Sequence, residues 1–153
     1  MTRVVKWGWQ ELSKPTGQKG PAIYAVRLVN CEAVVSIRRF LGVDREGLLT
    51  IGMTTNLERR RRQFIRGSSK GRGHSAANLL YFLSKFGALK RCFREPRYEL
   101  SFRRVTDERQ ARRWEAKMTK EYLGRFGEGP PLTSVIPDRY AHLRQRRLKP
   151  RRA

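Results

Sequence analysis

Four consecutive arginines, Arg59–Arg62, lie between two apolar residues, Leu57 and Phe64. A helix turns by about 100° per residue, so Leu57 and Phe64 project within about 20° of each other. Both can therefore be buried on one helical face, while most of the surrounding charge needs solvent or a partner. The segment predicts an amphipathic helix that packs on the rest of the fold along one narrow stripe.

The four arginines do not project in one direction. Arg59 and Arg62 lie about 200° and about 140° from Leu57, and we expect both to be solvated. Arg60 and Arg61 lie only about 60° and about 40° from it, where a guanidinium is costly to bury unless it is paired or opens into a cleft. Two interpretations remain for these two residues: buried stems with heads in water, or an arginine directed at an anion.

The charge of the chain predicts a polyanionic partner. The 153 residues contain 35 Lys and Arg against 13 Asp and Glu, a formal net charge of +22. Such charge repels itself in the compact state, so we expect a nucleic acid as the partner. DNA is the expected polymer, and RNA is the alternative. A membrane partner is not expected, because no apolar run approaches the roughly 20 residues that span a bilayer. Cys31 and Cys92 show no disulfide or zinc spacing, which predicts two buried thiols in a reducing cytoplasm.

Six segments have the residue pattern of regular secondary structure. Their order of strand, strand, helix, helix, strand, helix predicts an α/β (α+β) fold with a small three-stranded antiparallel sheet flanked by helices. Thr55 and Glu58 have the spacing of a capping box at the start of the first helix. Strands are predicted at residues 22–29, 47–54 and 97–105, and helices at residues 55–66, 75–86 and 107–123.

The ends of the chain differ from the middle in composition. Residues 1–20 form an N-terminal extension in which Trp7 and Trp9 are expected to cover an edge of the core. The folded domain is expected to span residues 21–136. Residues 137–153 form a basic C-terminal tail, with seven Lys or Arg and no acidic residue from position 139 onward, and we expect it to be disordered without a polyanion.

A carboxylate lies within an apolar stripe of the last predicted helix. Glu115 projects about 40° from Ala111, which begins that stripe. A lone carboxylate there would be costly or protonated, so a partner is expected. An ion pair with Arg60 or Arg61 and a hard divalent cation both remain open. The stripe consists of Ala111, Trp114, Met118 and Tyr122.

Five segments, in order along the chain, resemble motifs of the GIY-YIG nuclease family. "AIY" at residues 22–24 is similar to the GIY element, and "TIGMTTNLERR" at residues 50–60 to YIG-x-T-x-N-L-x-x-R. "GHSAANLLYFLSKFG" at residues 73–87 is similar to a His-Ser helix start in homing members. "ARRWE" at residues 111–115 resembles A-x-x-x-E, and "GEGPPLT" at residues 127–133 resembles the closing P-x-L-N. The resemblance covers about residues 20–135.

The resemblance implies a three-stranded antiparallel sheet and a divalent-metal-dependent endonuclease that hydrolyses DNA phosphodiester bonds. It implies that Glu115 holds one Mg²⁺ or Mn²⁺ and that Arg60 grips the scissile phosphate. Tyr24 and His74 would supply positioning and proton transfer, and Thr50 stands where the family has its second tyrosine.

Two positions depart from the family pattern. Thr50 replaces a tyrosine, and a threonine hydroxyl is a poor base although it still forms hydrogen bonds. Phe64 occupies a position that is His or Tyr in the family, and it cannot transfer a proton. A catalytically weak or inactive nucleic-acid-binding module of the same fold is therefore the alternative, followed by an RNA- or ribosome-associated basic protein. The residues expected to bind nucleic acid are Arg59, Arg61, Arg62, Lys70, Arg72, Arg144, Arg146 and Arg147.

Overall fold

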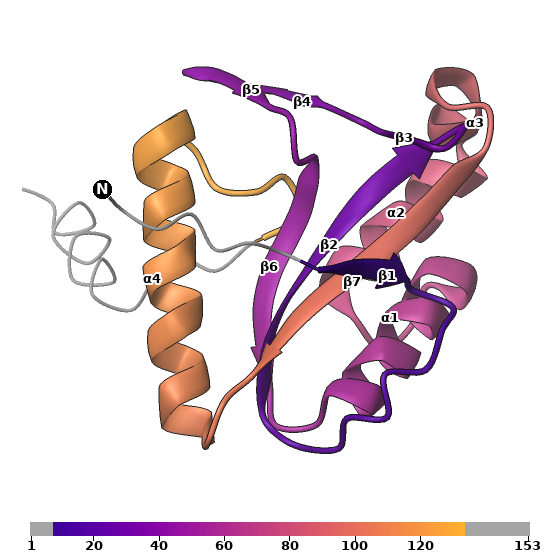
Figure 1. The fold of residues 1–153 in the computed structure, drawn as a ribbon. Helices are drawn as coiled ribbons and strands as arrows, with labels where there is room; N and C mark the ends of the chain where they lie inside the picture. The colour runs from indigo at the N-terminus through magenta and orange to yellow at the C-terminus, as the bar shows by residue number, and fades with distance from the viewer. Residues whose placement is uncertain (1–7, 134–153) are drawn as a thin grey trace, which may run out of the picture.

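The central element is a nine-residue strand, β2, with antiparallel partners on both sides (Figure 1). The computed structural model describes residues 8–133, so Trp7 and the basic tail with Arg144, Arg146 and Arg147 lie outside the described residues. The elements are β1 (Trp9–Glu11), β2 (Ala22–Asn30), β3 (Ala33–Val34), β4 (Ile37–Arg39), β5 (Gly42–Asp44), β6 (Leu48–Thr54), α1 (Leu57–Lys70), α2 (Ser75–Lys85), α3 (Ala88–Cys92), β7 (Pro96–Arg104) and α4 (Glu108–Phe126).

The sheet has five strands in place of the predicted three. β7 pairs with all nine residues of β2, while β6 and the short β3 share its other side. β1 pairs with the outer edge of β7. The mixed α/β class and the antiparallel sheet are confirmed. β1 and β3 have only three and two residues, too few to produce a recognisable alternating pattern.

Both faces of the sheet are covered by helices, α4 on one side and α1 with α2 on the other (Figure 1). Alternate side chains of β2 enter the two cores, as the pleat of a strand requires. Ile23 and Ala25 pack toward α4, whereas Tyr24 and Val26 pack toward α1 and α2. Burial on both faces explains why β2 is a nearly continuous run of apolar residues.

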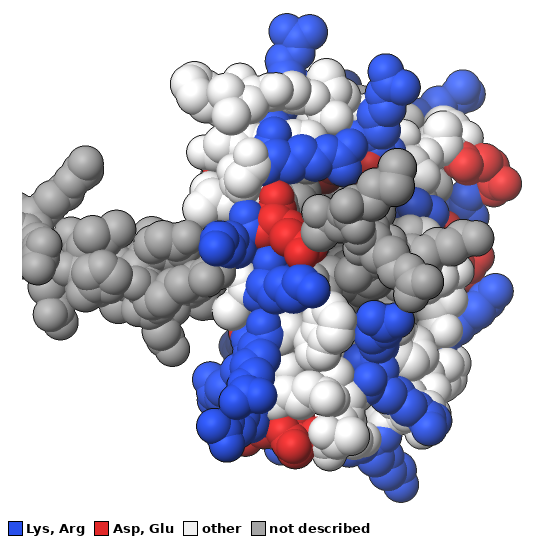
Figure 2. All heavy atoms as spheres, turned by 60° about the vertical axis from the view of Figure 1, so that its left-hand side comes forward, with Lys and Arg blue, Asp and Glu red and all other residues white. Residues whose placement is uncertain are grey.

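The solvent side of α4 is strongly basic, and Figure 2 shows Lys and Arg side chains spread over the face to which this helix contributes. The apolar stripe of α4 is buried as predicted, through Ala111, Met118 and Tyr122. The helix runs to Phe126, beyond the predicted end, and is closed by Gly127 in the left-handed conformation. Its exposed basic residues, which were not among the predicted nucleic-acid contacts, are Arg109, Arg112, Arg113, Lys117, Lys120 and Arg125.

The N-cap of helix α1 is Asn56, one residue after the predicted Thr55. The Asn56 side chain accepts a hydrogen bond of 2.9 Å from the backbone nitrogen of Arg59, so the predicted Thr55–Glu58 capping box is wrong. Asn56 is preferred at this position because its short side chain reaches the third amide of the helix. Leu57 and Phe64 are 0% and 1% exposed, which confirms the buried stripe.

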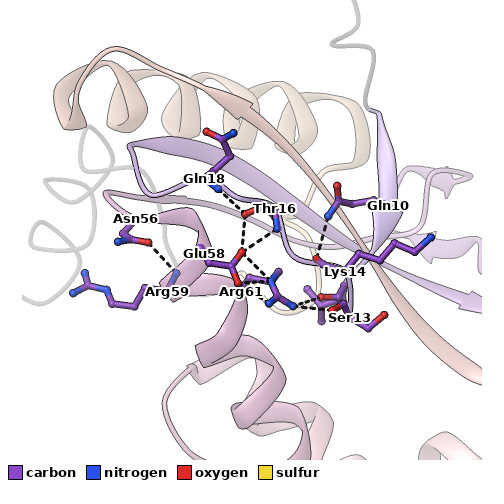
Figure 3. Close-up of polar contacts among 10 residues, drawn as sticks. Gln10, Ser13, Lys14, Thr16, Gln18, Asn56, Glu58, Arg59 and Arg61 are labelled. Carbon is purple, nitrogen blue, oxygen red and sulfur yellow. Dashed lines mark hydrogen bonds and ion pairs between the residues drawn. The ribbon is translucent and has the colours of Figure 1, made fainter.

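Arg61 is a buried structural residue, so its predicted role in binding nucleic acid is corrected. It is 7% exposed, and its Nη2 lies 2.6 Å from Glu58 Oε1 (Figure 3). Nη1 donates to the carbonyl oxygens of Leu12 and Ser13. Glu58 in turn accepts hydrogen bonds from the backbone and hydroxyl of Thr16. This network ties the segment before β2 to α1 and leaves the guanidinium no room for a phosphate.

The Glu58 network should make stability depend on acid pH. The hydrogen bond from Arg61 is the main cause that lowers the pKa of Glu58 from 4.5 to about 2. A lowered folded-state pKa stabilises the protein above pH 4.5, and this contribution is lost as the pH falls from 4.5 toward 2. We expect Glu58→Gln to lower the free energy of unfolding at pH 7 and to flatten its decline in acid. Urea unfolding at several pH values measures both effects.

The control for that experiment is Glu108→Gln. Glu108 forms an exposed pair with Arg112 on α4, and exposed pairs contribute little to stability. The Glu108 variant should keep the acid decline of the wild type. If the two variants gave the same decline, the Glu58 network would not be the acid-sensitive element.

The cysteines also differ from expectation. Cys31 and Cys92 are both exposed, and neither forms a disulfide. The prediction of buried thiols is therefore wrong. Trp9 packs against the α4-side core, as expected of a residue covering its edge, and the Arg27 guanidinium lies 4.2 Å from its ring centre. Within the described part of the chain, none of the helices combines the length and apolar character needed to cross a bilayer.

Candidate active site

A solvent-accessible hollow of about 160 Å³ lies at the outer edge of β6, and we call it the edge hollow. β6 pairs with β2 on one side only, so its other edge is closed by side chains and by the segment after α4. Five elements and the final described segment contribute to the wall. The lining residues are Tyr24, Thr50, Ile51, Gly52, Met53, Arg60, His74, Ser75, Ala76, Glu115, Leu132 and Thr133.

Tyr24 enters the edge hollow by lying across Gly52 on the neighbouring strand. The two residues are directly paired between β2 and β6. A Cβ added at Gly52 would lie 2.7 Å from both Cζ and Oη of Tyr24, closer than real Cβ atoms approach. The glycine is therefore required by the tyrosine ring that covers it, which gives a physical reason for this residue type at position 52.

Substituting this glycine should be costly. We expect Gly52→Ala to lower the free energy of unfolding by about 1–3 kcal/mol, because the new methyl group displaces the buried Tyr24 ring. Gly124→Ala is the matched control, since Gly124 is an exposed helical residue with no atom within 4 Å of the added Cβ. The control should raise stability by about 0.5–1 kcal/mol through helix propensity. Equal effects of the two variants in urea unfolding would contradict the proposed close approach.

His74 is the N-cap of α2 and is hydrogen-bonded to Tyr24. Its Nδ1 accepts from the backbone nitrogen of Ala77 at 3.4 Å, and its Nε2 lies 3.0 Å from Tyr24 Oη. A neutral imidazole that accepts at Nδ1 carries its proton on Nε2. Nε2–H then donates to the Tyr24 oxygen, and the phenolic proton is available to an acceptor in the edge hollow.

The charge states of this pair follow from burial. Burial, followed by the nearby Arg60 charge, lowers the pKa of His74 to about 4, so the imidazole is neutral at pH 7. Burial also raises the pKa of Tyr24 to about 12, with Arg60 opposing and Glu115 reinforcing the shift. Tyr24 is thus protonated at neutral pH. The charges of Arg60 and Glu115 therefore both act on the Tyr24 hydroxyl.

Arg60 and Glu115 reach the edge hollow from opposite faces of the sheet. Arg60 extends from α1, and its Nε is buried without a hydrogen bond among the described residues. Glu115 extends from α4, and its Oε1 accepts a hydrogen bond of 3.1 Å from the Met53 backbone nitrogen at the free edge of β6. A buried guanidinium donor without a partner is costly. Arg60 also lines the hollow, and a guanidinium that lines a hollow can bind an anion there.

Thr50 and Thr133 tie the last described segment to β6. Their hydroxyl oxygens are 3.1 Å apart, and Thr133 Oγ1 also accepts from the Ile51 backbone nitrogen at 3.1 Å. Thr50 is 4% exposed. The predicted site residue Thr50 therefore lies in the wall of the edge hollow with a hydroxyl engaged in structure.

Phe64 does not reach the edge hollow. It is 1% exposed and packs in the core, with its ring centre 4.9 Å from that of His74. The position that differs from the family pattern is thus occupied by a core residue that supports the His74 ring. The imidazole nitrogen that bonds the Tyr24 hydroxyl comes instead from His74, at the start of α2.

The remaining predicted nucleic-acid contacts are surface residues. Arg59, Arg62, Lys70 and Arg72 are exposed, in contrast to the buried Arg61. The solvent side of α4 carries further exposed basic residues. Helical periodicity could have identified these α4 residues from the sequence, because they project away from the apolar stripe of that helix.

Glu115 is the carboxylate among the residues that line the edge hollow. Among residues 8–133, no three His, Cys, Asp or Glu side chains are grouped so that they could hold a metal. Mg²⁺ in phosphoryl sites is commonly bound by one or two carboxylates together with waters and substrate phosphates. The single carboxylate of Glu115 beside a guanidinium is compatible with that mode. Comparisons with protein-family models, with curated proteins and with solved structures found no match.

Proposed function

We propose that this protein is a divalent-metal-dependent endonuclease that hydrolyses DNA phosphodiester bonds in the edge hollow. The observation that supports this most directly is the shared location of Tyr24, Arg60, His74 and Glu115. These residues are far apart in sequence and come from β2, α1, the start of α2 and α4. The net charge of +22 adds a reason for a polyanionic substrate.

Arg60 would bind the scissile phosphate. Its guanidinium, which lines the hollow, would donate to a non-bridging oxygen, and its charge would stabilise the negative charge that grows on the phosphoryl group in the transition state. A guanidinium presents a planar set of donors that matches a phosphate better than an ammonium does. The exposed arginines Arg59 and Arg62 would instead contact neighbouring phosphates and carry little of the chemistry.

Glu115 would hold Mg²⁺ or Mn²⁺. When bound, such an ion polarises a phosphoryl oxygen and lowers the pKa of water. The hydrogen bond from the Met53 backbone fixes the carboxylate at the edge of β6, so the position of the carboxylate does not depend on the ion. The remaining ligands would be water and phosphate oxygens.

Tyr24 and His74 would orient the attacking water. Because Nε2–H of His74 donates to Tyr24, the phenolic proton can bond a water molecule or phosphate oxygen in the hollow. Because its pKa is raised to about 12, the Tyr24 phenol is protonated at neutral pH. It would therefore act as a hydrogen-bond donor and not as a base. His74 fixes the direction of that donor.

A catalytically weak nucleic-acid-binding module is the second candidate. The observation that favours it is the absence of another proton-transfer group where the family resemblance places two. Thr50 is engaged by Thr133, and Phe64 is buried in the core. Such a module would bind duplexes without cleaving them. With six to ten phosphate contacts, its affinity would fall about 10³–10⁵-fold as the salt concentration rises from 50 to 200 mM.

Nicking of a supercoiled plasmid distinguishes the two candidates. We expect the wild-type protein to convert supercoiled DNA to nicked circles with Mg²⁺ or Mn²⁺, and EDTA to stop the reaction. A parallel assay with duplex RNA tests the choice of substrate, and preferential cleavage of RNA would replace DNA in the proposal. Binding to both polymers without cleavage under either metal would reject the nuclease and support the binding module.

A further inference from the structure

The β4–β5 hairpin exposes a cluster of apolar side chains at its end. Arg39 pairs with Gly42, so Phe40 and Leu41 form a two-residue loop that we call the hairpin tip. Phe40 is 80% exposed and Leu41 62%, and Val43 on β5 is 47% exposed. Apolar residues gathered at one protruding tip mark an interaction site more often than isolated ones do.

The hairpin tip is held in place through its backbone. The Leu41 amide donates to the carbonyl of Phe126 at 3.0 Å, and the Phe40 amide donates to Glu128 Oε1 at 2.7 Å. Arg39 also pairs with Glu128 at 3.1 Å. The tip is therefore fixed against the carboxyl end of α4, where the Phe40 and Leu41 side chains lie over Gly127 and stay largely exposed. This fixed position keeps the conformational cost of binding low.

The far end of the hairpin is anchored as firmly. Asp44 is 2% exposed, and its carboxylate accepts bonds from the amides of Gly47 and Leu48 and from the Tyr122 hydroxyl. Tyr122 belongs to α4. Both ends of the hairpin are thus bonded to α4 or to the turn that follows β5, so the position of the tip relative to α4 is set by the fold.

The surroundings of the hairpin tip favour a polyanion with an apolar interior. Arg38 precedes the tip and Arg45 follows the hairpin along the chain, and both are exposed, in a chain of net charge +22. Duplex nucleic acid has this combination, because its charged backbone encloses stacked apolar bases. Apolar side chains such as Phe and Leu insert between base pairs in several architectural proteins, next to basic residues that hold the backbone.

We infer that the hairpin tip is a wedge that inserts Phe40 and Leu41 into a base step of the nucleic acid bound to this protein. Glu115 and the contact at Phe126 lie on the same helix, separated by eleven residues or about 16 Å. That length corresponds to about five base pairs at 3.4 Å each. A duplex lying along α4 would therefore have its inserted step about five base pairs from the cut. That position depends on the proposed function, whereas the insertion itself does not.

Insertion can be measured without cleavage, by placing 2-aminopurine in turn at each step of a short duplex in EDTA. Wild-type protein should raise the fluorescence strongly at one step, because the base unstacks there. The Phe40→Ala, Leu41→Ala double variant should lose this signal and bind the duplex about tenfold more weakly, within the range known for loss of a base-stacking side chain. Phe86→Ala is the matched control, since Phe86 on the far end of α2 is 72% exposed, and it should keep the signal.

Both variants remove exposed side chains, so thermal unfolding should show that they fold like the wild type. An unchanged fluorescence signal in the double variant, or equal loss in Phe86→Ala, would overturn the wedge. The wedge would also be overturned if the double variant changed only self-association in sedimentation experiments, because the partner of the hairpin tip would then be a protein surface. A wedge signal in a protein that never cleaves would uphold this inference and reject the nuclease, and cleavage without the signal would do the opposite.

Discussion

Glu115→Gln is expected to slow metal-dependent nicking of plasmid DNA by at least about 10²-fold, because the amide cannot serve as the anionic ligand of Mg²⁺. The amide oxygen of the glutamine can still accept the hydrogen bond that the Met53 backbone nitrogen donates to Glu115. We therefore expect the fold and the DNA affinity in EDTA to change little. Single-turnover nicking rates over a range of Mg²⁺ concentrations measure the loss.

The control is Glu121→Gln on the same helix. Glu121 does not line the edge hollow and lies 4.0 Å from Lys117 in an exposed pair. Its substitution removes the same charge from α4 and should leave nicking within about twofold of the wild type. Equal activity of Glu115→Gln and wild type would show that this carboxylate does not serve the chemistry.

Arg60→Ala is expected to reduce the turnover number by about 10²–10³-fold, the range found when one preorganised donor to a developing oxyanion is removed. The physical reason is the position of its guanidinium, whose buried Nε has no hydrogen bond within residues 8–133. A group that acts mainly in the transition state should affect kcat more than KM. Steady-state nicking with each variant separates these two constants.

Arg59→Ala provides the comparison for Arg60. Arg59 precedes it on α1, is exposed and lies outside the lining of the edge hollow. Loss of a surface phosphate contact should weaken DNA binding modestly and reduce the salt dependence of affinity by about one unit of slope, with kcat retained. If both arginine variants lost kcat equally, the distinction between the hollow and the surface would be wrong.

The long elements could be predicted from sequence because each is long enough to repeat its pattern. β2, β6 and β7 have seven to nine residues, and the apolar stripes of α1 and α4 extend over several turns. The short strands β1 and β3 owe their existence to pairing with distant residues, which no local pattern records. The helix α3 was missed because its five residues are too few to show a helical repeat, and so short a helix is not stable on its own.

The site was only partly predictable. Helical periodicity indicated that Arg60 and Glu115 border buried stripes, but it could not show that the two stripes face one edge of β6. It also could not separate Arg60 from Arg61, whose partner Glu58 and carbonyl acceptors at residues 12 and 13 depend on a distant segment. Likewise, the bond between His74 and Tyr24 joins residues 50 positions apart, so it depends on how α2 packs.

The most direct test of the central claim is diffraction from crystals grown with a short DNA duplex and Mn²⁺, whose anomalous scattering locates the ion. We predict one Mn²⁺ at the Glu115 carboxylate and one phosphate of the duplex between that ion and the Arg60 guanidinium, inside the edge hollow. Mn²⁺ bound elsewhere, with DNA held only by exposed arginines such as Arg59 and Arg62, would contradict it.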